Sequence, residues 1–129
     1  MKYLLDTNII IDHLRGKKPI DVNFIKVGCY VSILTQGELF YGAYKSSQPE
    51  RNLAKIKTMF SDLGIQTVTL DEKIIDQYAR LKTKLERKGE KLDEFDLLIG
   101  ATALKMNLIL VTGNLFHFQR ISRLKVIQQ

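Results

Sequence analysis

Residues 2–8 read KYLLDTN, and this stretch decides the fold class. Residues 3–5 form a short apolar run that predicts a buried strand, and residues 9–14 take up the spacing of an amphipathic helix. Asp6 lies at the junction, where the strands of an open α/β sheet end beside the groove that binds ligands. Asp6 is therefore the first candidate site residue, although Asp6 or Thr7 can also serve simply as a helix cap.

The remaining sequence alternates predicted strands with predicted helices. This order is typical of a parallel sheet covered by helices on both faces, a three-layer α/β/α domain of about five strands. Thr35 and Glu38 match a capping box and predict a helix start. Strands are predicted at 3–5, 29–33, 65–70, 108–111 and 126–127, and helices at 20–27, from 35, at 49–63, at 72–89 and at 92–107.

The composition fits a compact domain. With 129 residues, 45% hydrophobic and 26% charged, we expect a single domain over 1–129. Apolar runs are too short to span a bilayer and no cleavable leader is apparent, so we expect no membrane association and a cytoplasmic location. The single cysteine, Cys29, is expected to be a buried, inert thiol.

The net charge of +6 is compatible with a polyanionic partner. Seven basic residues lie between Lys73 and Lys91, and three more follow at Arg120, Arg123 and Lys125. A run of this kind is more commonly the solvated face of a helix. Charge alone therefore allows nucleic-acid binding without demonstrating it.

Three acids are predicted in similar local settings. Asp6 follows the first strand, Glu38 lies in the first turn of the helix after the second strand, and Asp96 lies in the first turn of the apolar helix at 92–107. Each has a local structural role as an alternative, as a cap or as favourable charge at a helix N-terminus. Those roles do not explain why all three acids would lie on the same side of the sheet.

Converging carboxylates require a cation. Two carboxylates about 4 Å apart repel by roughly 1 kcal/mol in water and about 4 kcal/mol at an effective dielectric constant of 20. Oxygen ligands suit Mg²⁺ or Mn²⁺, and the sequence has no Cys and His spacing of the kind that zinc sites use. Such an ion can activate water for hydrolysis of a phosphodiester.

The motifs LLDTN, TQGEL, DLLIGATAL and VTGNLFHF together resemble a PIN-domain ribonuclease, most closely the VapC-type toxins of toxin–antitoxin pairs. The resemblance implies a metal-dependent endoribonuclease that cleaves RNA, often transfer RNA. It also implies a homodimer and inhibition by a small cognate antitoxin. Asp6, Glu38 and Asp96 match the acidic positions that hold Mg²⁺, with Mn²⁺ as an alternative ion.

Three further positions are secondary candidates. Thr112 matches the hydroxyl position of the family, and Asn114 stands where many members carry a fourth acid. An Asn carbonyl can accept a hydrogen bond but brings no negative charge, so we expect one tightly held ion. Asp93 is a candidate for supporting the site, although a helix cap is the favoured interpretation.

Aromatic residues give weaker hypotheses. Phe116 and Phe118 can stack on bases, but packing in the core is favoured for both, and for His117 between them. Tyr41 and Tyr44 lie on an apolar stripe that is interpreted first as core. The second interpretation is a groove for an antitoxin segment, which the resemblance favours.

Two other function classes remain open. A nonenzymatic RNA- or partner-binding domain of the same fold would explain Asn114. A Mg²⁺-binding phosphoacceptor signalling domain has a similar size, but it needs adjacent acids after the first strand and a lysine after a late strand. Here Asp6 stands alone and Thr112 follows the late strand, which disfavours that class.

Overall fold

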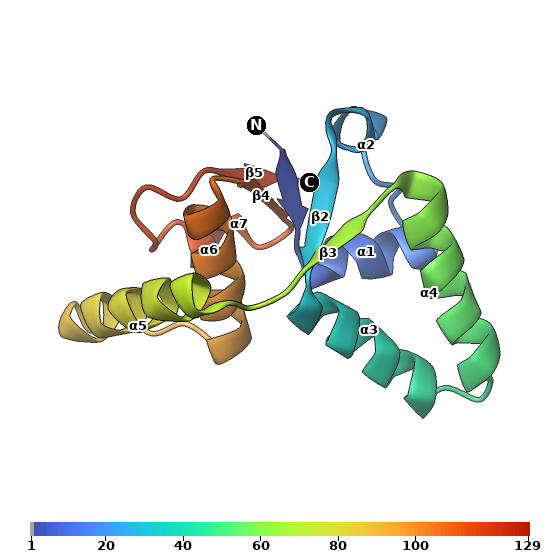
Figure 1. Cartoon of the computed structure of the whole chain (residues 1–129), viewed down its shortest axis with the longest axis horizontal. Helices are drawn as coiled ribbons and strands as arrows, with labels where there is room; N and C mark the ends of the chain where they lie inside the picture. Colours follow the sequence, from blue (N-terminus) through green and yellow to red (C-terminus); the bar gives the residue numbers. More distant parts are fainter. Residues whose placement is uncertain (1) are drawn as a thin grey trace.

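The computed structural model describes residues 2–129 and contains a five-stranded parallel sheet (Figure 1). The strand order is β3-β2-β1-β4-β5, which places the first strand of the chain at the centre. Register pairs Leu4 with Tyr30 on one side and with Leu110 on the other. The strands are β1 (Tyr3–Leu5), β2 (Cys29–Ser32), β3 (Gln66–Val68), β4 (Ile109–Thr112) and β5 (Val126–Gln128).

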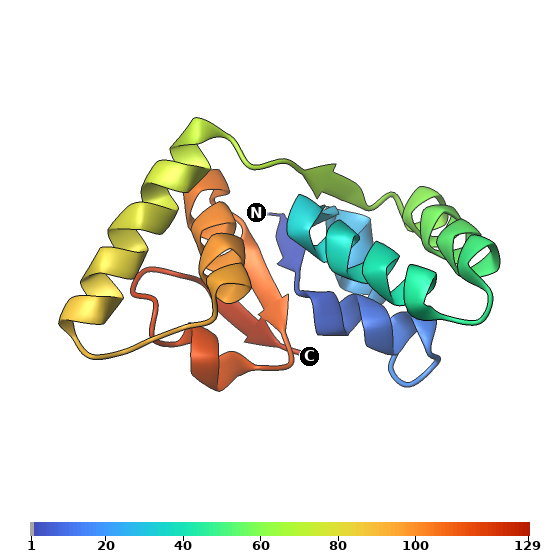
Figure 2. The same ribbon diagram turned by 90° about the horizontal axis from the view of Figure 1, so that it is seen from below.

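Helices cover both faces of this sheet, which confirms the predicted three-layer architecture (Figures 1 and 2). One face carries α1 (Thr7–Leu14), α2 (Val22–Val27), α3 (Ile33–Lys45) and α4 (Pro49–Leu63). The other carries α5 (Glu72–Arg87), α6 (Glu94–Met106) and α7 (Leu115–Phe118). No helix within residues 2–129 is long and apolar enough to cross a membrane.

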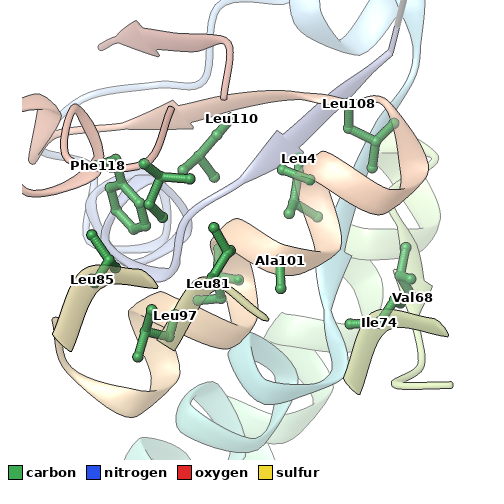
Figure 3. Packing of buried hydrophobic residues seen from close by; sticks show 13 residues of the cluster. Leu4, Val68, Ile74, Leu81, Leu85, Leu97, Ala101, Leu108, Leu110 and Phe118 are labelled. Carbon is green, nitrogen blue, oxygen red and sulfur yellow. The ribbon is translucent and has the colours of Figure 1, made fainter. Parts of the chain in front are cut away.

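Alternate residues of the central strands build two separate cores. Leu4 and Leu110 pack toward α5 and α6, and they belong to the cluster in Figure 3 that also contains Leu81 and Leu97. Leu5, the next residue along β1, packs on the opposite face toward α1 and α3. Each fully buried leucine contributes roughly 1.5–3 kcal/mol, so the alternation fixes β1 between the two helical layers.

Most predicted helix ends are confirmed. Pro49 occupies the first turn of α4, where its missing N–H has no cost. Asp71 accepts a hydrogen bond from the Ile74 amide and caps α5. Gly64 and Asn107 close α4 and α6 in the left-handed conformation, which glycine and asparagine adopt most readily.

The predicted start of α3 is wrong. The helix begins at Ile33 because the Ser32 side chain accepts a hydrogen bond from the Leu34 amide. Thr35 is therefore inside the helix and fully buried rather than at its cap. Glu38 consequently lies in the second turn of α3, not in the first.

One strand is clearly shorter than predicted, and one helix was not predicted. The third strand is shorter than 65–70, because only residues 66–68 pair with β2. The short helix α7 was not predicted, since four residues are too few to show a periodic pattern.

Several aromatic residues predicted as core are exposed. Tyr41 and Tyr44 are 64% and 65% exposed on α3, so their assignment to the core is wrong. Phe118 is fully buried as predicted, whereas Phe116 is 71% exposed. The single-turn helix α7 separates them, since residues two apart on a helix point to different sides.

Candidate active site

Asp6 is held by hydrogen bonds to both of its carboxylate oxygens. It follows β1 directly and is the N-cap of α1, where Oδ1 accepts from the Thr7 amide at 2.9 Å. Oδ2 accepts from the hydroxyl of Thr112, the last residue of β4, at 2.8 Å. Asp6 is only 7% exposed. The cap and the candidate site function therefore coexist in the same side chain, with Asp6 oriented by two elements.

A chain of hydroxyl groups links α1 to Glu38. The Thr7 Oγ1 donates to Glu38 Oε1 at 2.7 Å and lies 3.0 Å from Thr35 Oγ1. Because Thr7 gives its one hydroxyl proton to Glu38, Thr35 must be the donor in the second bond. Glu38 is thereby bonded to the residue that follows Asp6 in the sequence.

Asp96 has a strongly perturbed acidity. It lies in the first turn of α6 with its side chain 25% exposed. Burial, followed by the negative charges of Asp6 and Asp93, raises the pKa of Asp96 from 3.8 to about 6. Glu38 also raises this pKa, whereas His117 lowers it. The charges of Asp6, at the start of α1, and of Glu38, on α3, therefore both act on Asp96 of α6.

The secondary candidates adjoin the acids in different ways. Thr112 contacts Asp6 directly and is fully buried. The backbone amide of Asn114 donates to the same hydroxyl, Thr112 Oγ1, at 3.0 Å. Asp93 caps α6 by accepting from the Phe95 amide at 3.2 Å, as predicted, and it affects Asp96 through its charge.

His117 is not packed in the core as predicted. Its side chain is 46% exposed, and its Nδ1 lies 2.7 Å from Asn114 Nδ2 and 3.9 Å from Asp96 Oδ2. The reason is again α7, which turns the side chain of residue 118 inward and leaves 117 beside the acids. His117 thus contacts Asn114 at hydrogen-bond distance and lies near Asp96 without a hydrogen bond to it.

The donor atoms of this region suit a hard divalent cation. The groups present are carboxylate, hydroxyl and amide oxygens, which Mg²⁺ and Mn²⁺ prefer. Burial is the main cause of the raised pKa of Asp96, and the added repulsion from Asp6, Asp93 and Glu38 would be relieved by such an ion. However, no three His, Cys, Asp or Glu side chains within residues 2–129 are arranged to hold a metal ion. The carboxylates would have to approach one another more closely to share one.

Two residues of the site were not identified from the sequence. Thr7 donates to Glu38 and Thr35 bonds the same Thr7 hydroxyl, although neither was proposed for this role. A signal was present for both: Thr7 adjoins Asp6, and Thr35 lies one helical turn before Glu38. Because both threonines were interpreted as helix caps, their contacts with the site were not predicted.

Comparison with known proteins identifies relatives over nearly the full chain. Ribonuclease VapC2 from Haemophilus influenzae is 36% identical over 129 residues, covering 97% of this chain and 96% of the relative. The tRNA(fMet)-specific endonuclease VapC from Shigella flexneri is 34% identical, with the same coverage.

A solved structure shows the same fold. The VapBC2 structure from Rickettsia felis, bound to a DNA fragment from its promoter, superposes with a TM-score of 0.89 at 30% identity. The match covers 99% of this chain and 98% of that chain. In addition, the PIN domain pattern matches residues 3–124, which include every candidate site residue. The chain therefore belongs to the PIN domain family.

Proposed function

We propose that this protein is a metal-dependent endoribonuclease and the toxin of a toxin–antitoxin pair. The single observation that carries the proposal is that Asp6, Glu38 and Asp96 meet at one end of the sheet: Thr7, which follows Asp6, donates to Glu38, and the charges of Asp6 and Glu38 add to burial in raising the pKa of Asp96. Relatives that share 34–36% identity over nearly the whole chain are named as ribonucleases or as a tRNA endonuclease. RNA is therefore the proposed substrate, with transfer RNA as the first candidate.

The proposed metal ligands are Asp6, Glu38 and Asp96, with Mg²⁺ as the first ion and Mn²⁺ as the alternative. When bound, the ion would activate water and stabilise the charge on the leaving oxygen. The chain itself positions these ligands: Thr112 and the Thr7 amide fix Asp6, and the Thr7 hydroxyl fixes Glu38. Asn114 in place of an acid leaves less negative charge for a second ion.

The proposed antitoxin site is a groove between α1, α3 and α4. Its volume is about 320 Å³, and apolar side chains such as Leu14, Leu39 and Ile56 line it. Figures 1 and 2 show α1, α3 and α4 in the same part of the molecule. Glu38 also lines the groove, so an apolar antitoxin segment bound here would lie against the proposed site and block it.

The proposed function extends to the oligomeric state of the protein and to its location in the cell. We propose a homodimer, which sedimentation velocity of the purified protein tests directly. A cytoplasmic location is proposed because cellular RNA is the proposed substrate.

The decisive experiment is cleavage of a mixed small-RNA pool by the purified protein. We expect cleavage with Mg²⁺ or Mn²⁺, none with EDTA, and none with Asp96→Asn. Asp62→Asn is the matched control, since Asp62 is an exposed carboxylate on α4. Cleavage that persists in EDTA or in the Asp96→Asn variant would contradict the proposal.

The second candidate function is a nonenzymatic RNA-binding domain. Asn114, in place of an acid beside Thr112, is the observation that favours it. That function would give tight RNA binding that weakens steeply with salt, without any metal-dependent cleavage. The same RNA pool distinguishes the two functions.

A further inference from the structure

Phe116 is the most exposed large apolar side chain within residues 2–129. It is 71% exposed, although Phe118, two residues later, is fully buried. A ring this exposed leaves a large apolar surface in water. Another planar aromatic group can stack on that surface. No core contact explains its position on α7.

Arg120 holds this ring from one side. Its guanidinium carbon lies 5.6 Å from the centroid of the Phe116 ring, within the range of a cation–π contact. The same guanidinium donates from Nη1 to the backbone oxygen of Lys91 at 2.7 Å. The ring is therefore supported by a side chain that is itself tied to the segment before α6, and it remains largely open to solvent.

A positively charged cavity adjoins the ring. It has a volume of about 590 Å³ and is lined by Phe116 together with Lys88, Lys91 and Arg120. Glu90 is its only acidic lining residue among those described, so three cations face one anion. This volume falls within the roughly 300–1,000 Å³ typical of cavities that hold small ligands. The apolar ring and the positive charges together suit a nucleotide. Its base can stack on Phe116, and the lysine and arginine side chains can neutralise its phosphate.

The cavity also lies close to the proposed active site. The ring centroids of Phe116 and His117 are 6.5 Å apart, and His117 Nδ1 is 3.9 Å from Asp96 Oδ2. A strand whose phosphate lies at Asp96 can therefore place a neighbouring nucleotide at Phe116. In a duplex that base would remain stacked inside the helix, so the arrangement selects for unpaired RNA.

We propose that Phe116 is a stacking platform for an unpaired base next to the scissile phosphate, with Lys88 and Lys91 contacting the adjoining backbone. This subsite gives the enzyme a preference for single-stranded segments such as loops. The inference rests on the proposed ribonuclease function for the identity of the strand, whereas base stacking itself requires no catalysis.

The binding test uses the absence of tryptophan from the chain. In a Phe116→Trp variant the new indole is the only tryptophan fluorophore in the protein. EDTA is added so that the RNA is not cleaved during the measurement. We expect a single-stranded RNA oligonucleotide to quench its fluorescence and a duplex of the same sequence to quench it much less. Val22→Trp is the matched control, since Val22 is 60% exposed on α2. Equal quenching in the two variants would overturn the proposal.

The second test measures affinity and activity. Loss of one base stack in Phe116→Ala is expected to weaken binding of single-stranded RNA by about 5- to 150-fold, and Phe116→Tyr is expected to restore it. In cleavage, the loss is expected mainly in KM. Unchanged affinity and KM in Phe116→Ala would overturn the subsite while leaving the ribonuclease intact. Failure of the wild type to cleave would overturn only the proposed function.

A second copy of this chain is the competing occupant of the Phe116 surface. Sedimentation velocity of wild type and Phe116→Ala separates the two cases. We expect the same oligomeric state for both proteins. If the variant forms a smaller assembly but binds RNA with the same affinity as the wild type, the ring belongs to a protein interface. That result would refute the nucleotide subsite.

Discussion

Replacing Asp96 by asparagine tests the electrostatics of the site in the absence of RNA. The pKa of Asp96 rises from 3.8 to about 6 on folding, so the folded chain binds this proton more tightly than the unfolded chain. Ionisation of Asp96 therefore destabilises the fold. The free energy of unfolding should decrease as pH rises from about 4 to about 6, and the penalty should be complete above that interval.

The pKa difference sets the size of this penalty. At about 1.4 kcal/mol per pH unit, a rise from 3.8 to about 6 corresponds to at most about 3 kcal/mol at neutral pH. Because the side chain is 25% exposed and an asparagine amide is also desolvated, we expect about 1–2 kcal/mol. Asp96→Asn should therefore be more stable than the wild type by this amount in metal-free buffer.

Urea denaturation in EDTA provides the assay. The variant and the wild type are compared at about pH 7.5 and about pH 4, with Asp62→Asn as the control for loss of a carboxylate. The stabilisation should be present at the higher pH and nearly absent at the lower one, where Asp96 of the folded wild type is protonated. A variant no more stable than wild type at pH 7.5, or one equally stabilised at both pH values, would refute the reasoning.

Four further predictions test neighbouring parts of the structure. Mg²⁺ should raise the unfolding midpoint of the wild type but not of Asp96→Asn, measured by thermal denaturation; equal shifts in both would exclude Asp96 as a ligand. Thr112→Val removes the buried donor to Asp6 Oδ2, so we expect a loss of about 1–3 kcal/mol in urea denaturation and reduced RNA cleavage. Leu110→Ala, at a fully buried position of β4, should cost about 2–5 kcal/mol, and a smaller loss would contradict its place in the core. Burial raises the pKa of the Cys29 thiol, so a thiol reagent should label the native protein slowly and the unfolded protein rapidly; rapid native labelling would contradict the burial.

The sequence was informative about elements with strong local signals. The order of strands and helices followed from hydrophobic patterns, and the ends of α4, α5 and α6 followed from Pro49, Gly64, Asp71, Asp93 and Asn107. These features depend on backbone conformation and on hydrogen bonds within a few residues. Where two local signals competed, as for Ser32 and Thr35 at the start of α3, the wrong cap was chosen.

The site was predictable as a set of residues but not as an arrangement. Asp6, Glu38 and Asp96 were selected because each adjoins a strand end or a helix start, and the resemblance assigned their roles. The hydroxyl chain from Thr35 through Thr7 to Glu38 joins residues 28 and 31 positions apart, and Thr112 reaches Asp6 across 106 positions. Such bonds have no periodic signature in the sequence.

Local sequence thus specified the α/β order, the apolar strands and the acidic candidates, because hydrophobic periodicity and helix capping depend on nearby residues. Tertiary packing decided the rest. It gave Asp96 its raised pKa, since burial and the charges of Asp6 and Glu38 arise only when three separate elements meet. It also turned Phe116 outward beside Arg120 and Lys91, because Phe118 fills the core and α7 leaves residue 116 on the other side.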